Sequence, residues 1–343
     1  MKRILPALLL IAAAGCIERT ETITVREGGS ARIEVAIKGD PGDVKEGEAL
    51  PSAESGWEVT DRTEKDDAGK ETLTRSATRE VAAGAAIPAS FAAEGGRAAQ
   101  LGLAFPTTVT LDRREDGTYY HFRRAYARRA WWPVEFLRQE FFETDDIKAI
   151  LAKDPKTLAE AERTRLVQAL VEYSAQEIGM FVQTAAEALP EPLPQLAFLK
   201  ARAHAQAVYR DSKLADRVVA LLTSDAKADL GPLEQEVRRG VRDATAKSLR
   251  ESGVPAAAID VYLDRLQDVR DAHDLTQDLG DEHWTVTVKL PGRIVGDNSD
   301  APGEGDRAAG AVAWRFPGKA LCDRDLILLA TSFVPKESQA EKR

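Results

Sequence analysis

The sequence predicts an α+β protein, in which an antiparallel β-rich domain built from N- and C-terminal segments is interrupted by an all-α helical insertion. In residues 16–130 and again in 280–335, apolar side chains alternate with polar ones, which is the period of half-buried strands. In residues 131–279, Ala, Leu, Glu and Arg dominate, and apolar positions recur at the helical period. Because the C-terminal strands are too few to form a stable core alone, we expect them to complete the sheet that the N-terminal strands begin. The alternative is three independent pieces.

The N-terminal segment contains three expected strand pairs. The first spans residues 23–37 and the second spans 57–77, each with a Gly-containing turn between two alternating runs. The third spans 109–122, where Asp116-Gly117 separates two β-prone runs, and Asp-Gly is a strong hairpin signal. We therefore expect three antiparallel pairs.

The middle of the chain is expected to fold as successive helices separated by Pro or Gly. The first helix opens at Pro133, since proline is well tolerated in a first helical turn. The apolar residues of each segment lie on one side, so the helices should pack on one another or on a sheet. The remaining expected helices are 158–189, 195–222, 232–252 and 255–272.

The strand pattern returns after Gly280. The charged residues 336–343 are expected to form a frayed tail. The expected strands are 284–290, 311–316 and 326–333, with a short helix as the alternative for the last of them.

The first fifteen residues have the features of a secretory signal. Lys2 and Arg3 form a short positive region, residues 4–12 are apolar, and the small residues 13–15 precede Cys16. The apolar run is too short to cross a membrane, because a spanning helix needs about 20 apolar residues.

This segment resembles the lipobox of bacterial lipoproteins, although Ala13 stands where leucine is usual. The resemblance implies that residues 1–15 are a signal peptide and that Cys16 becomes the N-terminus, carrying acyl chains such as palmitate. Two or three chains anchor a protein stably, since each buried CH₂ contributes about 0.8 kcal/mol. Ile17 and Glu18 follow the cysteine instead of Asp, which by resemblance to proteobacterial sorting favours the outer over the inner membrane. The alternatives are an ordinary signal peptide with a chance cysteine, or a short buried helix.

Composition restricts the possible partners. Without Lys2 and Arg3, 45 basic side chains remain against 56 acidic ones, which gives a net charge of −11. So acidic a body argues against a general binder of nucleic acid or anionic membranes, although a local basic patch remains possible. We expect no nucleic-acid partner.

The sequence contains no recognisable catalytic, metal or cofactor motif. It lacks His-x-x-x-His, paired cysteine ligands, Gly-x-Ser-x-Gly and a phosphate loop. The oxygen-rich loop 297–306 lacks EF-hand spacing, so we expect it to be solvated. Cys322 stands alone if Cys16 is acylated, and we expect it to be a small buried hydrophobe. We therefore name no catalytic residue, no metal ligand and no cofactor.

The hairpin region 112–132 mixes arginines with aromatic residues. In an extended strand, Tyr120, Phe122, Arg124 and Tyr126 would share one face. Arginines beside aromatic rings can bind anionic head groups, glycans or an acidic partner. The alternative, which we favour, is that the arginines pair with the chain's own acidic residues while the rings lie in the core. The candidate patch consists of Tyr120, Arg123, Arg124, Tyr126, Arg128 and Arg129.

The C-terminal segment shows a second resemblance. A strand at 285–290 is followed by Pro291-Gly292, by Asn298, and by a tryptophan strand at 312–316. This order is similar to segments of uncharacterised bacterial lipoproteins, including the mycobacterial LppM-like group. The similarity covers about 35 residues and transfers no functional residue, and turn chemistry and core packing explain its Pro-Gly and Trp314.

These observations predict a non-enzymatic envelope lipoprotein, attached to a membrane through lipid on Cys16 and facing the periplasm. Its expected role is to bind another envelope protein or lipid, or to support envelope assembly. One alternative is a carrier of lipid or another apolar ligand, which would need a deep apolar cavity. The other is an enzyme whose site is assembled only in the fold, which would show perturbed carboxylates near His121 or His283.

Overall fold

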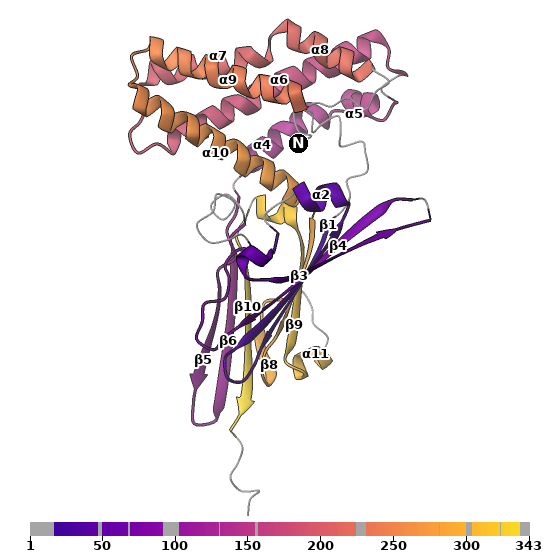
Figure 1. Cartoon of the computed structure of the whole chain (residues 1–343), viewed down its shortest axis with the longest axis vertical. Coiled ribbons are helices and arrows are strands. Elements are labelled where there is room, and N and C mark those ends of the chain that lie inside the picture. Colours follow the sequence, from indigo (N-terminus) through magenta and orange to yellow (C-terminus); the bar gives the residue numbers. More distant parts are fainter. Residues whose placement is uncertain are drawn as a thin grey trace, which may run out of the picture. The chain divides into compact units, whose positions relative to one another are not determined.

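The computed structural model describes residues 17–46, 50–67, 69–91, 103–129, 131–154, 157–223, 231–280, 282–299, 304–322 and 324–336. Cys16 and residues 337–343 of the expected tail lie outside them. The chain forms two compact units, one within Trp131–Asp274 and the other within Gly15–Ala130 and Leu275–Arg343 (Figure 1). The first is helical and the second is rich in strands, which confirms the predicted α+β class with a helical insertion.

Six strands of the β-rich unit form the first sheet. Its order is β3 (Glu58–Lys65), β4 (Glu71–Val81), β2 (Ala31–Gly39), β1 (Ile17–Val25), β7 (Glu282–Lys289) and β9 (Ala311–Pro317). The C-terminal strands β7 and β9 therefore extend the sheet that the N-terminal strands begin. β7 runs parallel to β1, with Ile17 opposite Glu282, whereas the other neighbours are antiparallel.

Four strands form a second sheet, so the expectation of one sheet was wrong. Its order is β5 (Thr107–Arg113), β6 (Gly117–Tyr126), β10 (Leu326–Pro335) and β8 (Arg293–Asp297), all antiparallel. The three predicted N-terminal pairs all form, but the third lies in this second sheet. β10 is a strand, which excludes the helix considered for it. A period-2 pattern predicts strands but does not specify which of them are neighbours.

The Pro291-Gly292 turn takes the chain from one sheet to the other. Gly292 has a φ of +77°, and a Cβ there would lie 2.2 Å from the carbonyl oxygen of Phe333. Both the left-handed backbone and the close approach require glycine. The crossing between the sheets therefore explains the glycine of this turn.

The inner faces of the two sheets share one core. The ring of Tyr126 on β6 lies edge-on to Trp284 on β7 at 5.7 Å, and Phe122 stacks on Trp314 of β9 at 6.2 Å. Apolar residues of β1, including Ile23, belong to the same cluster. The β-rich unit is therefore a sandwich closed by aromatic contacts between N- and C-terminal strands.

The helical unit surrounds one long helix, α6 (Glu160–Glu187), whose buried residues occur on all sides. Gly179 of α6 lies against α7, where a Cβ would come within 2.6 Å of Gln206 Nε2. The buried alanines of α7 are also small, so α6 and α7 can pack closely against each other. The other helices are α4 (Trp132–Phe142), α5 (Asp145–Leu151), α7 (Gln195–Tyr209), α8 (Ser212–Thr223), α9 (Gly231–Glu251) and α10 (Ala256–Gly280).

Candidate functional site

Strand β6 places the residues of the candidate patch on opposite faces. Tyr120, Phe122, Arg124 and Tyr126 point into the sandwich, as the alternation predicted, whereas Arg123 is exposed. The surface-patch interpretation was therefore wrong for three of its residues. Arg124 is 1 % exposed and Tyr126 0 %, and the hydroxyl of the buried Tyr120 donates to the carbonyl of Glu27 at 2.8 Å.

Arg124 is buried because it pairs with Glu21 on the inner face of β1. Its Nη1 donates to Glu21 Oε2 at 2.5 Å, and its guanidinium lies 4.2 Å from the ring centre of Phe105. This supports the alternative that the arginines neutralise the chain's own acids. Glu21 was missed by the sequence reasoning, although a charged residue at an inward position of an alternating strand is a signal that could have found it.

A second buried ion pair lies beside the first. Arg19, two residues before Glu21, donates to Glu282 Oε1 on β7 at 3.0 Å and stacks on Trp284 at 4.2 Å. The two pairs tie β1 to β7 and to β6, and so join both sheets. Removing one partner of a buried pair is strongly destabilising, whereas apolar replacement of both partners is often neutral, so the presence of these pairs does not by itself indicate a gain in net stability.

Arg128 and Arg129 follow β6 and lie apart from Arg123. The backbone N–H of Arg128 donates to Asp325 Oδ1, and that of Arg129 donates to the carbonyl of Leu321, each at 2.7 Å. These bonds attach the end of β6 to the segment before β10. The six residues of the candidate patch therefore occupy three separate places.

The outer surface of the second sheet carries a cluster that the sequence reasoning did not name. We call it the β10 face, formed by Tyr119, His121, Arg123, Val295, Ile327, Leu329, Thr331 and Phe333. Ile327, Leu329 and Val295 are 41 %, 42 % and 49 % exposed. One sequence signal could have predicted this face. The outward positions of β10 are apolar, although its inward positions are apolar as well.

Short contacts order the β10 face. The rings of Tyr119 and Phe333 lie 4.8 Å apart, and His121 Nδ1 forms a 3.1 Å hydrogen bond with Thr331 Oγ1. Arg123 stands directly opposite Leu329 in the β6–β10 register. The face thus presents aliphatic side chains around one guanidinium.

Asn298 fixes the start of β10 just beyond the end of β8. Its Nδ2 donates to the carbonyl of Ile327 at 2.7 Å, and its Oδ1 accepts from Leu329 N at 2.8 Å and from Trp314 Nε1 at 3.0 Å. The side chain therefore replaces a backbone partner and orients the outward residues of β10. The hydrogen bond between Asn298 and Trp314 therefore gives both residues a structural role at this end of the two sheets.

The helical unit contains a separate group of titratable side chains around His273. An enzyme was expected to show such a group near His121 or His283 instead. The hydroxyl of Tyr173 donates to Glu177 Oε1 at 2.6 Å, and desolvation raises the pKa of Glu177, opposed by the nearby His273. His273 is buried between the rings of Trp131 and Phe181, at 5.1 and 4.8 Å. A protonatable carboxyl beside an imidazole can transfer protons, although structural networks show the same shifts.

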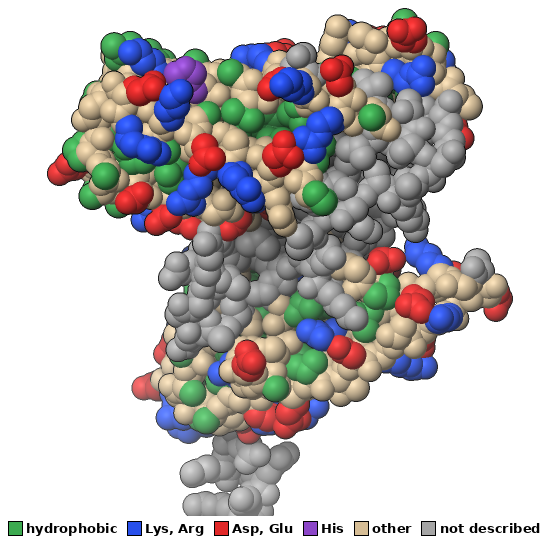
Figure 2. All heavy atoms as spheres, turned by 45° about the horizontal axis from the view of Figure 1, so that its top comes forward, with side chains coloured by type: hydrophobic (Ala, Val, Ile, Leu, Met, Phe, Trp, Pro, Cys, Tyr) green, Lys and Arg blue, Asp and Glu red, His purple; other side chains and the backbone are tan. Residues whose placement is uncertain are grey.

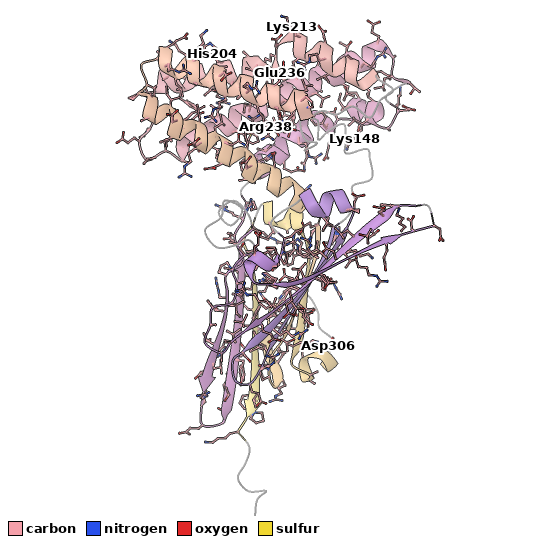
Figure 3. The ribbon with its side chains drawn as sticks, viewed as in Figure 1. Lys148, His204, Lys213, Glu236, Arg238 and Asp306 are labelled. Atoms are coloured by element: carbon pink, nitrogen blue, oxygen red, sulfur yellow. The ribbon has the colours of Figure 1, made fainter. Side chains whose placement is uncertain are left out.

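Arg238, labelled on α9 in Figure 3, connects α9 to Asp274, the neighbour of His273. It donates to Glu234 at 2.6 Å and to Asp274 at 2.9 Å. Desolvation raises the pKa of Asp274, but hydrogen bonds to His273 and Arg238 and the charges of these two residues outweigh it, so the pKa is lowered. On the helical surface shown in Figure 2, acidic and basic side chains are interspersed, without a large area of one sign.

Of the oxygen-rich loop 297–306, the structure describes residues 297–299 and 304–306, and Asp297 at the end of β8 is held by nearby side chains. Asp297 accepts hydrogen bonds from Ser299 Oγ at 2.5 Å and from Arg307 Nε at 3.0 Å. These bonds lower its pKa despite desolvation. No cluster of His, Cys, Asp and Glu suited to a metal ion occurs among the described residues.

Compared with protein-family models, with curated proteins and with solved structures, the chain gives no match.

Proposed function

We propose that this chain is a lipid-anchored envelope protein, acylated at Cys16 and facing the periplasm, that binds another envelope component without catalysing a reaction. The signal-like segment that ends at Cys16 supports the anchor, and the residues after it favour the outer membrane. In the part of the chain that the structure describes, no helix is long and apolar enough to cross a membrane.

The observation that carries the binding role is the β10 face. Ile327, Leu329 and Val295 are large aliphatic side chains exposed on adjacent strands of one sheet. Grouped apolar exposure marks interaction surfaces, whereas single exposed apolar residues need no explanation. Arg123 among them selects for a partner that combines apolar contacts with a carboxylate or phosphate, since a guanidinium binds such groups in a bidentate manner.

Photo-crosslinking in cells tests this role. A photo-reactive amino acid in place of Leu329 should form a saturable crosslink that disappears in an Arg123→Ser variant. The same amino acid in place of Leu196, an exposed apolar residue of α7, is the control. Equal crosslinking at both positions, or insensitivity to Arg123→Ser, would contradict binding at the β10 face. Mass spectrometry of the peptide that begins at Cys16 tests the anchor separately.

A second candidate function is proton-transfer catalysis in the helical unit. It is favoured by one observation, the desolvated Glu177 hydrogen-bonded to Tyr173 and close to His273. Lipid and metabolite profiles of cells carrying Glu177→Gln should then differ from those of wild-type cells. Glu172→Gln, on the same helix but paired with Arg210, is the control. Identical profiles for all three would exclude this candidate.

A further inference from the structure

Strand β3 forms one edge of the first sheet, and no strand pairs with its outer side among the residues that the structure describes. It has eight residues and no proline, every side chain except that of Val59 is exposed, and its pairing with β4 contains no bulge. Strand β2 ends opposite Leu73, so the tip of the β3–β4 hairpin extends beyond it (Figure 1). Three strands separate β3 from β7, where the chain returns from the helical unit. Such an edge is a template for pairing with another strand, unless its side chains prevent this.

The hydrogen bonds of the hairpin indicate which backbone groups of β3 face outwards. Beside the turn, the N–H of Asp66 donates to the carbonyl of Lys70 at 3.0 Å. Hydrogen-bonded and non-hydrogen-bonded pairs alternate along an antiparallel ladder, so the even-numbered residues of β3 bond to β4. The N–H and C=O groups of Asp61, Thr63 and Lys65 therefore point away from β4, toward the outer side of the sheet.

The side chains of β3 are complementary to a second copy of the same strand. Two copies can lie antiparallel about a two-fold axis that passes beside Thr63, perpendicular to the sheet. Asp61 then stands opposite the partner's Lys65, and Arg62 stands opposite the partner's Glu64. The symmetry repeats both pairs on the other side of the axis. Opposite charges and threonine pairs in these positions stabilise an antiparallel ladder.

The same charges disfavour the neighbouring registers. An axis at any of the charged residues 61–62 or 64–65 would place that residue directly opposite its own copy. Like charges that face each other across two strands are destabilising. An axis at Thr60 retains only the pairs between Glu58 and Arg62. The charges on this edge therefore favour one register and oppose the others.

Charges on β4 extend the complementary pattern on one face of the sheet. Asp61 accepts two hydrogen bonds from Arg75, at 2.8 and 2.7 Å, and Lys65 lies 2.9 Å from Glu71. A row across the two copies would contain Arg75, Asp61, the partner's Lys65 and the partner's Glu71. The sign of the charge alternates along this row, so the pairs within each chain support those between chains.

On the other face, Arg62 and Glu64 lie 2.7 Å apart in the same strand, with side chains that are 76 % and 54 % exposed. Together with their copies in the partner they would form a square in which every side joins opposite charges. The turn acids Asp66 and Asp67 come next, and they would stand opposite the uncharged residues 59–60 of the partner. No like charges therefore face each other directly in this register.

We propose that the chain forms a two-fold symmetric dimer in which β3 pairs with β3 of a second copy, so that the first sheet continues from one protomer into its partner. The outward backbone groups then form about six hydrogen bonds, two for each hydrogen-bonded pair of residues. The assembly stops at two copies, because the contact is self-complementary and each protomer has one β3 edge. The proposal involves neither Cys16 nor the β10 face, so it is independent of the proposed function.

Charge reversal in the purified full chain tests this pairing, with sedimentation velocity in detergent as the measurement. Arg62→Glu and Glu64→Arg each place like charges across the interface, and each should weaken dimerisation by about tenfold or more. Mixing these two variants brings opposite charges together again, so mixed dimers should form. The double variant Arg62→Glu/Glu64→Arg should dimerise as the wild type does. Arg113→Glu makes the same change of charge at an exposed position of β5 and should have no effect.

A cysteine at the axis tests the register in cells. Hydrogen-bonded pairs have Cα atoms about 5.5 Å apart, which a disulfide can span, so Thr63→Cys should give a covalent dimer under mild oxidation. Thr60 is also exposed, but it would lie about 20 Å from its copy, so Thr60→Cys should give none. Both variants carry Cys322→Ser, and a chain with Cys322→Ser alone is the control for Cys16.

Four results would overturn the inference. They are a monomeric wild-type chain, dimerisation that Arg62→Glu leaves unchanged, failure of the two single variants to pair when mixed, and equal covalent dimers from Thr60→Cys and Thr63→Cys.

Discussion

Replacing Arg124 by methionine is expected to destabilise the sandwich by about 3–5 kcal/mol, the range for removing one partner of a buried ion pair. The side chains of Arg124 and Glu21 are 1 % and 0 % exposed, and their charged atoms are 2.5 Å apart. Methionine retains much of the packing beside Phe105 but leaves the carboxylate of Glu21 buried without its cation. Since Glu21 Oε1 has no hydrogen-bond partner in the described part of the chain, little else can compensate.

Two further variants isolate the ion pair. Arg123→Met removes the same charge from the next position of β6, where the side chain is exposed, and should change stability by less than about 0.5 kcal/mol. Arg124→Met combined with Glu21→Leu removes both charges and should recover most of the loss, because apolar replacement of both partners is often neutral or stabilising.

Urea unfolding of the purified chain measures these differences. Trp57, Trp284 and Trp314 lie in the sandwich core, whereas Trp131 and Trp132 belong to the helical unit, so all variants are made in a Trp131→Phe/Trp132→Phe background. Tryptophan fluorescence then reports on the sandwich, while far-UV circular dichroism follows the helices. The reasoning is refuted if Arg124→Met is as stable as Arg123→Met, or if the double variant is no more stable than Arg124→Met alone.

Three other predictions concern pH, a turn and a side-chain bridge. Desolvation raises the pKa of Glu177, so the native state binds its proton more tightly than the unfolded state, and stability falls as pH rises through that pKa. Glu177→Gln should therefore unfold at a higher temperature than wild type at pH 7, and this gain should disappear in acid. Glu172→Gln should do the opposite, since Arg210 lowers the pKa of Glu172 and its contribution is lost as pH falls; the same sign for both would contradict the assignment. Gly292→Ala should lower the free energy of unfolding in urea by about 1–3 kcal/mol more than Gly69→Ala does. Both glycines have positive φ, but a Cβ at Gly69 would meet nothing within 4 Å. Equal losses of stability would argue against the clash with Phe333. Asn298→Ala should cost about 1–3 kcal/mol and increase hydrogen exchange at Leu329, whose N–H it binds; unchanged exchange there would show that the bridge is dispensable.

Local patterns in the sequence predicted much of the fold. The alternation in β6 placed Tyr120, Phe122 and Arg124 on one face, and the structure confirms this. Helices α4, α6, α9 and α10 begin within two residues of the positions that the period and the Pro and Gly boundaries predicted. The expectation of one helix at 195–222 was wrong, because the chain breaks between α7 and α8, and α5 was not predicted. These features depend on residues close in sequence, so a single sequence is enough to infer them.

Partners distant in sequence were not predictable in the same way. Glu21 is 103 residues from Arg124, and nothing in either strand specifies the other. The division into two sheets depends on the crossing at Gly292, and strand alternation carries no information about it. His273 had the pattern of an ordinary helix residue, because its neighbours Trp131 and Phe181 come from other parts of the helical unit.

The pairing of β1 with β7 has a consequence for biogenesis. Arg19 and Glu282, which connect these strands, are 263 residues apart and lie on either side of the helical insertion. During synthesis from the N-terminus, β1 would expose the edge that pairs with β7, and its inward Arg19, until the last fifth of the protein had followed. The helical unit could form its own core in the interval. Closing such a long loop is entropically costly and slow. A chain truncated anywhere before β7 would therefore retain an open strand edge and the unneutralised charge of Arg19, and an open edge is a template for pairing with other chains.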